Sequence, residues 1–247
     1  MNHSHYILII AHPDDESMFF LPTLYNLLNH PSGTASIHIL CLTNGNYDNL
    51  GPIRESELLV AAAIISNRIK VTIINDEDIQ DGPKESWTGE HVGKILRKHI
   101  AQEKMKNIVF VTFDEGGVSG HVNHVDTYKG VFEFYSRERR RDDELWTLHS
   151  VHNPVTKYIP IIELFKLVVM WLCSFVVTRQ RDLVDANRRT FRMFYPALVW
   201  KAMKAHHSQF VWYRRLFVVF SRYSYVNDLT IYKSKDVLID DGRRKVE

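Results

Sequence analysis

The side chains best suited to chemistry are concentrated in one short run, His12-Pro13-Asp14-Asp15-Glu16. Imidazole nitrogens and carboxylate oxygens bind zinc in catalytic sites, where three protein ligands leave one position open. One histidine and one aspartate of this run could supply two ligands, and the neighbouring carboxylate would stay free to act as a base. Acidic residues also suit the first turn of a helix, where the helix dipole favours negative charge. The two interpretations are compatible.

A third metal ligand is expected from a second segment, His121-Val122-Asn123-His124, which follows a glycine-rich loop. Histidines three residues apart share one face of a helix, although an isolated pair of this kind is a weak signal. His149 and His152 have the same spacing, but they overlap an apolar run that suggests a strand. We therefore favour the pair at 121 and 124.

Alternating strands and helices are expected to bring these segments together. Continuous apolar runs predict buried strands, and apolar residues three and four apart predict helices. The strands are predicted at 6–11, 37–42, 71–74 and 108–112, and the helices from Met18, around 57–65 and over 91–103. This alternation predicts a Rossmann-like α/β fold, an open and mostly parallel sheet with helices on both faces. Ligands bind beyond the carboxyl ends of such strands, where both histidine-bearing segments fall.

Composition excludes several other classes of protein. The chain has 247 residues, of which 45% are hydrophobic and 24% charged, so it is neither disordered nor fibrous. Cys41 and Cys173 lie far apart in apolar runs, which favours buried thiols in a reducing compartment. With 31 basic and 29 acidic residues, the chain is not expected to bind nucleic acid. No secretory signal is expected at the start, because the first apolar run is too short.

Three segments together resemble the LmbE-like family of zinc-dependent de-N-acetylases, namely residues 11–16, residues 44–46 with Arg54 and Glu57, and residues 117–124. The stretch 202–223 is similar to the branch of this family that acts on N-acetylglucosaminyl-phosphatidylinositol. The resemblance implies one LmbE-like domain over 1–247 that binds Zn²⁺ or another divalent metal. The implied reaction gives glucosaminyl-phosphatidylinositol and acetate, an early step of GPI-anchor biosynthesis. The implied location is the cytosolic face of the endoplasmic reticulum membrane.

The same resemblance implies roles for individual residues of the two motifs. His12, Asp15 and His124 would hold the metal, and Asp14 would be the general base. His121 would polarise the amide carbonyl and stabilise its oxyanion. We expect a protonated His121 ring here, since one well-placed donor to developing negative charge is worth roughly 3–4 kcal/mol.

The resemblance further implies that Arg54 and Asp81 hold the substrate, and the residues themselves leave alternatives open. Arg54 offers a forked, permanently charged donor for hydroxyls or phosphate, but it could instead pair with Glu57 one helical turn away. Asp81 could be a turn residue before Gly82-Pro83. His206 could reach the site or lie on the surface of a helix.

A glycolipid substrate predicts contact with a membrane surface. The best candidate for such contact is an apolar insertion at about 158–178, whose apolar core, 167–177, has 11 residues. A spanning helix needs about 20 apolar residues, so a span, an interfacial or re-entrant helix, and a core helix all remain open. Residues 210–217 mix aromatic side chains with arginine, which also suits an interface.

Two other functions compete with glycolipid deacetylation. A soluble LmbE-type enzyme would apply the same metal chemistry to a small N-acetylglucosamine conjugate. A nucleotide-binding module or a metal-binding scaffold would lack turnover altogether. The apolar stretch and the similarity over 202–223 favour the glycolipid. The absence of a Gly-x-Gly-x-x-Gly turn after the first strand argues against a dinucleotide site, and the full set of ligands and base argues against an inactive scaffold.

Overall fold

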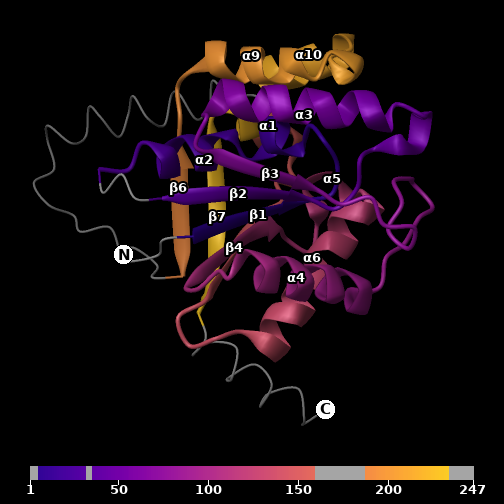
Figure 1. Cartoon of the computed structure of the whole chain (residues 1–247). Coiled ribbons are helices and arrows are strands. Elements are labelled where there is room, and N and C mark those ends of the chain that lie inside the picture. Colours follow the sequence, from indigo (N-terminus) through magenta and orange to yellow (C-terminus); the bar gives the residue numbers. More distant parts are fainter. Residues whose placement is uncertain (1–4, 32–34, 159–186, 234–247) are drawn as a thin grey trace, which may run out of the picture.

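The sheet has seven strands in the order β3-β2-β1-β4-β5-β7-β6 (Figure 1). The computed structural model describes residues 5–31, 35–158 and 187–233. The first five strands pair in parallel and the last two antiparallel. The strands are β1 (His5–Ile10), β2 (Ser36–Cys41), β3 (Ile69–Ile73), β4 (Ile108–Phe113), β5 (Glu144–Leu148), β6 (Arg188–Arg192) and β7 (Val226–Lys233). The expected Rossmann-like, mostly parallel open sheet is confirmed.

Strand β1 lies in the middle of the sheet and is buried on both faces. Ile7, Ile9 and Ile10 are fully buried, as its uninterrupted apolar sequence predicts. The register aligns the carboxyl ends of neighbouring strands, because Ile10 pairs with Cys41 of β2 and Leu8 with Val111 of β4. The loops that begin at residues 11, 42 and 114 therefore meet at one edge of the sheet.

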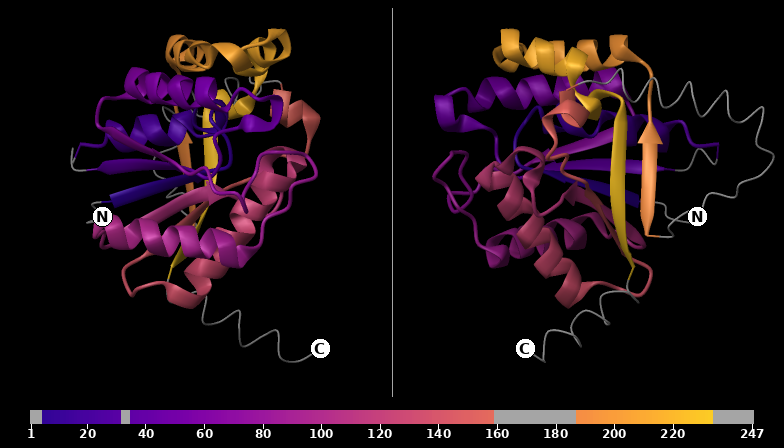
Figure 2. Two further views of the ribbon diagram at one scale, coloured as in Figure 1. Left: turned by 45° about the vertical axis from the view of Figure 1, so that its right-hand side comes forward. Right: turned by 180° about the vertical axis from the view of Figure 1, so that it is seen from behind.

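Helices cover both faces of the sheet, as expected (Figures 1 and 2). The helices α4 (Gly89–Glu103) and α6 (Val122–Glu138) pack against each other on one face. The helices α2 (Leu21–Leu28) and α3 (Gly51–Ile65) lie on the other. Two C-terminal helices, α9 (Pro196–Ala205) and α10 (Trp212–Phe220), form a further layer beyond α3.

The single helix expected from Met18 onward is instead two helices. α1 (Asp15–Phe19) ends at Phe19, the next residue Phe20 adopts φ −111°, and α2 begins at Leu21. A continuous helix would press the ring of Pro22 against the carbonyl of Met18, so the helix has to restart here. Pro22 then lies in the first turn of α2, where its missing N–H costs nothing. That part of the prediction is confirmed.

The apolar stretch 158–178 lies almost wholly outside the described residues, which stop at Tyr158 and resume at 187. Cys173 falls in the same gap, while Cys41 is a buried free thiol. In the described part of the chain, no helix combines the length and apolar character needed to cross a bilayer.

Candidate active site

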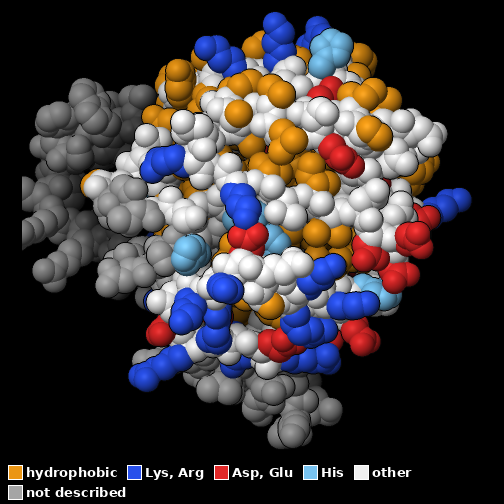
Figure 3. Space-filling model, viewed as in Figure 1, with side chains coloured by type: hydrophobic (Ala, Val, Ile, Leu, Met, Phe, Trp, Pro, Cys, Tyr) orange, Lys and Arg blue, Asp and Glu red, His pale blue; other side chains and the backbone are white. Residues whose placement is uncertain are grey.

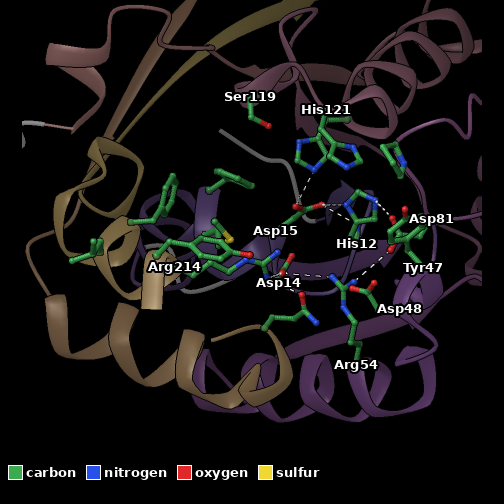
Figure 4. A pocket seen from close by; sticks show the side chains of 18 of the residues that line it. His12, Asp14, Asp15, Tyr47, Asp48, Arg54, Asp81, Ser119, His121 and Arg214 are labelled. Atoms are coloured by element: carbon green, nitrogen blue, oxygen red, sulfur yellow. Dashed lines mark hydrogen bonds and ion pairs between the residues drawn. The ribbon is translucent and has the colours of Figure 1, made fainter. Parts of the chain in front are cut away.

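A cavity of about 870 Å³ opens at the carboxyl edge of the sheet (Figure 4). Its wall contains every site residue expected from the sequence, drawn from four different loops and helices. These residues are His12, Asp14, Asp15, Arg54, Asp81, His121 and His124. The two motifs, more than a hundred residues apart, thus meet at the place that the topology of a parallel sheet predicts.

His12, Asp15 and His124 lie within contact distance of one another, and all three are buried. Asp15 Oδ1 is 3.1 Å from His124 Nε2, and Asp15 Oδ2 is 3.7 Å from His12 Nδ1. Asp15 Oδ2 also accepts hydrogen bonds from the backbone N–H groups of Ala11 and His12. These backbone bonds fix the turn after β1 and leave Oδ1 facing His124.

The remaining ring nitrogens of the two histidines are held by other groups. His12 Nε2 lies 3.0 Å from Asp81 Oδ1 and 3.0 Å from Asn123 Oδ1, and because both are acceptors, this nitrogen carries the hydrogen. His124 Nδ1 donates to the carbonyl of Gly117 at 3.0 Å. His12 Nδ1 and His124 Nε2 are therefore free to accept a metal. Histidine ligands of metals are oriented in this way by carboxylate and carbonyl partners, so the donor set fits a divalent ion.

Charges inside this cluster shift the pKa values of its members. Burial alone would raise the pKa of Asp15, but the charge and hydrogen bond of His124, with the charge of His12, lower it overall. Burial alone would lower the pKa of His12, but its bond to Asp81 and the nearby aspartates raise it. The pKa of Asp81 is likewise lowered by His12 and Arg54 against the effect of burial. The carboxylates therefore stay ionised at neutral pH, as metal ligation requires.

His121 completes a cluster of three histidines, whose ligand nitrogens lie within 4.8 Å of one another. Burial, followed by the charges of His12 and His124, lowers the pKa of His121 to about 4. These surroundings favour a neutral His121 ring over the protonated ring expected from the sequence. His121 Nδ1 accepts a hydrogen bond from the N–H of Asn123, so the neutral ring carries its hydrogen on Nε2. The ring can thus still donate one hydrogen bond, as a neutral group.

Asp14 adopts an unusual backbone conformation, with φ 121° and ψ −21°. A residue other than glycine persists there only when its surroundings hold it, and here the N–H of Asp14 donates to Glu16 Oε2. The carboxylate is held by two guanidinium groups, since Oδ2 contacts Arg214 Nη1 and lies 3.5 Å from Arg54 Nη2 (Figure 4). The buried carboxylate therefore has a fixed orientation in the cavity wall.

Arg54 enters the site from α3 and is buried rather than solvated. Its guanidinium donates to the carbonyls of Gly45 and Pro13 and lies 3.4 Å from Asp81 Oδ2. Gly45 permits this approach, because a Cβ there would lie 2.5 Å from Arg54 Cζ. The alternative pairing with Glu57 is wrong, since Glu57 instead accepts from the N–H and hydroxyl of Ser208. Arg54 is thus part of a network that joins the loops after β1, β2 and β3.

His206 follows neither alternative that the sequence left open. It is fully buried, and its Nε2 lies 2.7 Å from Glu16 Oε1, which is also fully buried. Burial alone would lower the pKa of His206, but the charge and hydrogen bond of Glu16 raise it overall. The pair links α9 to the first motif from behind the cavity wall.

Two polar residues that hold the side chains of His12 and Asp14 were not predicted from the sequence. Asn123 lies between the two histidines of the second motif, and its contacts to His12, Gly82 and Glu85 join the loop after β3 to α6. The position of Asn123 between two histidines was the available signal. Arg214 contacts Asp14 across 200 residues of chain. No local pattern indicates that pairing, although Arg214 lies within the stretch 202–223 that resembled the family.

One wall of the cavity is apolar, in contrast to the polar cluster opposite. The side chains of this wall are aromatic or aliphatic and come from α1 and α10. They are Met18, Phe19, Tyr213, Leu216, Phe217 and Phe220. Phe19 and Phe217 meet edge to face with ring centroids 5.6 Å apart. The cavity can therefore hold a ligand with one polar end and one apolar end.

Comparisons with known proteins agree with this arrangement. The family model described as PIG-L, GlcNAc-PI de-N-acetylase, matches residues 7–135. The N-acetylglucosaminyl-phosphatidylinositol de-N-acetylase of Bos taurus is 35% identical over 227 residues, covering 90% of this chain and 81% of that protein. The Saccharomyces cerevisiae enzyme of the same name is 30% identical over 244 residues, covering 91% and 80%.

Solved structures of deacetylases share the fold. The N,N'-diacetylchitobiose deacetylase from Pyrococcus horikoshii has a TM-score of 0.56 at 16% identity, covering 97% of this chain and 86% of that one. The zinc-inhibited form of teicoplanin deacetylase Orf2 has a TM-score of 0.56 at 11% identity, covering 94% and 99%. At these identities the likeness is one of fold.

Proposed function

The chain belongs to the PIG-L family of de-N-acetylases, and from this premise we propose that it hydrolyses the acetamide of N-acetylglucosaminyl-phosphatidylinositol. The products are glucosaminyl-phosphatidylinositol and acetate, and the reaction is an early step of GPI-anchor biosynthesis. The observation that carries this proposal is the cavity itself. It combines a set of metal-ligand side chains and a buried carboxylate with an apolar wall, which suits a sugar amide joined to a lipid.

We assign the metal to His12, Asp15 and His124, with Zn²⁺ as the ion. The two ring nitrogens that face the Asp15 carboxylate, His12 Nδ1 and His124 Nε2, support this set. A divalent ion held there supplies Lewis-acid polarisation of the acetamide oxygen and makes a water more acidic. Asp81 and Asn123 act on His12 from outside the ligand set, as does the Gly117 carbonyl on His124.

Asp14 serves as the general base in this proposal. Its carboxylate accepts a proton from the attacking water as the C–O bond forms, and then passes that proton to the nitrogen of the leaving amine as the C–N bond breaks. His121 donates its Nε2–H to the acetamide oxygen as negative charge develops there. Arg54 and Arg214 hold the Asp14 carboxylate in place, and Arg54 and Asp81 face the cavity where the sugar would lie.

We further propose that the enzyme works at a membrane surface, on the cytosolic face of the endoplasmic reticulum. The location follows from the family resemblance, and the apolar wall of the cavity supports contact with lipid. Fractionation of cells that express the tagged chain, with protease protection of the tag, tests the location.

Acetate release tests the catalytic proposal directly. Purified protein should release acetate from N-acetylglucosaminyl-phosphatidylinositol, lose this activity to a chelator and regain it with Zn²⁺. Turnover of small N-acetylglucosamine conjugates without turnover of the glycolipid would overturn the substrate assignment. Full activity after complete removal of the metal would overturn the role of the ion.

A further inference from the structure

In the described part of the chain, the exposed large apolar side chains lie on one side. Among the described residues they come from 47–64, 155–158 and 194–220, and none comes from α4 or α6 on the opposite side. Figure 3 shows apolar side chains gathered over α3, α9 and α10, with charged side chains more frequent below them. Large exposed apolar patches mark sites where a protein meets another surface.

Helix α10 contributes the most exposed part of this side. We call this exposed surface the α10 face. It is made of residues that are 38–71% exposed, namely Val211, Trp212, Tyr213, Leu216, Val219 and Phe220. Residues 212, 216 and 219 follow the i, i+4, i+7 spacing of one helical stripe. Val218, on the opposite side of the helix, is buried. The helix is therefore amphipathic, with an aromatic-rich stripe directed away from the core.

The segment of chain that carries α9 and α10 has charge of one sign. Residues 188–227 contain eight of the chain's 31 basic residues and none of its 29 acidic residues. Lys201 and Lys204 of α9 and Arg215 of α10 are exposed. An anionic phospholipid surface complements this combination of aromatic stripe and basic rim, because aromatic residues settle at the headgroup level and basic residues pair with anionic lipids. A second copy of this chain would bring like charges together.

The α10 face is continuous with the cavity. Tyr213, Leu216 and Phe220 are about half exposed and also line the cavity wall. On the same helix, Arg214 contacts Asp14. A lipid-linked substrate could therefore pass from a bilayer into the cavity along these side chains, with its sugar directed at Asp14.

We propose that α9 and α10 dock on an anionic phospholipid bilayer, with the α10 face toward the acyl chains, and that the glycolipid enters the cavity between Tyr213, Leu216 and Phe220. This inference rests on the proposed function for the identity of the substrate. The docking surface itself, however, rests on the exposure and charge of the described helices.

Vesicle flotation of the full chain tests the docking surface. Two double variants are tested. One is Trp212→Ser/Val219→Gln, which changes residues outside the cavity wall, and the other is Lys201→Gln/Lys204→Gln. The matched control is Lys94→Gln/Lys98→Gln, which removes the same charge from exposed positions of α4. Vesicles of phosphatidylcholine with phosphatidylserine should bind the wild type more tightly than vesicles of phosphatidylcholine alone. The lysine variant should lose about 25-fold in partitioning to the anionic vesicles, since each basic residue near such a surface contributes about fivefold.

Activity assays separate failure of docking from failure of the proposed function. Both test variants should lose turnover of glycolipid embedded in anionic vesicles but keep turnover of a short-chain glycolipid below its micelle concentration. If both variants bound anionic vesicles as tightly as the wild type does, the proposed docking surface would be wrong. A wild-type dimer that Trp212→Ser/Val219→Gln converts to a monomer would also overturn it, in favour of a second copy. Absence of acetate release from both substrates, with the expected flotation, would overturn the function alone. Circular dichroism confirms that each variant is folded.

Discussion

Asp81→Asn separates two roles for one side chain. The family resemblance implies that Asp81 holds substrate, whereas in the structure its Oδ1 lies 3.0 Å from His12 Nε2 and its Oδ2 lies 3.4 Å from Arg54 Nη1. If Asp81 orients His12, the neutral amide loses the charged part of that hydrogen bond and metal affinity falls. Partners of this kind contribute about 10–100-fold in metal affinity, which corresponds to about 1.4–2.7 kcal/mol. A hydrogen bond to a charged group is worth about 1.5–3 kcal/mol, so the two estimates agree.

The assay is a competition for Zn²⁺ against a chromophoric chelator, run beside steady-state kinetics on the glycolipid. We expect Asp81→Asn to weaken Zn²⁺ binding by about 10–100-fold and to lose turnover that added metal partly restores. Asp48→Asn is the matched control, because Asp48 lines the same cavity but is exposed. Unchanged Zn²⁺ affinity in Asp81→Asn, together with a raised KM, would refute the orienting role and leave Asp81 as a substrate ligand.

Substitutions at three further residues test the base, the oxyanion donor and His38, a buried histidine of the sheet. Asp14→Asn should keep the bound metal and lower kcat by about 10²–10⁴-fold; near-normal kcat would remove Asp14 from the base role. His121→Ala should lower kcat by about 10²–10³-fold, and His121→Gln should recover part of that loss because it restores a neutral donor; equal loss in both would contradict donation. Burial, with the charges of His99 and Lys70, lowers the pKa of His38 to about 4, against the opposing charge of Glu103. The unfolded chain, where histidine titrates near 6.5, therefore takes up a proton that the folded chain resists, and the free energy of unfolding falls by about 2 kcal/mol between pH 6.5 and 4. Urea unfolding of His38→Gln should lack this share of the pH dependence, and an unchanged slope would refute it.

The fold and most of the candidate site could be predicted from the sequence because both depend on short-range patterns. A continuous apolar strand followed by a polar loop is readable locally, and the parallel sheet brings such loops together without further information. Arg214 could not be predicted, because its contact with Asp14 depends on how α10 packs onto the rest of the chain. The neutral state of His121 was missed for a related reason, since its pKa depends on burial and on His12 and His124. Residue type alone predicts neither the contact of Arg214 with Asp14 nor the neutral state of His121.

The position of α10 is tied to the geometry of the base. Asp14 holds φ 121°, and a backbone in that region needs support from surrounding groups. The support for its carboxylate comes from Arg54 of α3 and Arg214 of α10. If α10 were displaced, Asp14 would keep only the more distant guanidinium, 3.5 Å away. Arg214 lies beyond residues 7–135, which the family model covers, so the candidate site extends past that region. Helix α10 therefore carries both Arg214, which holds the carboxylate of the proposed base Asp14, and the face that we propose meets the lipid.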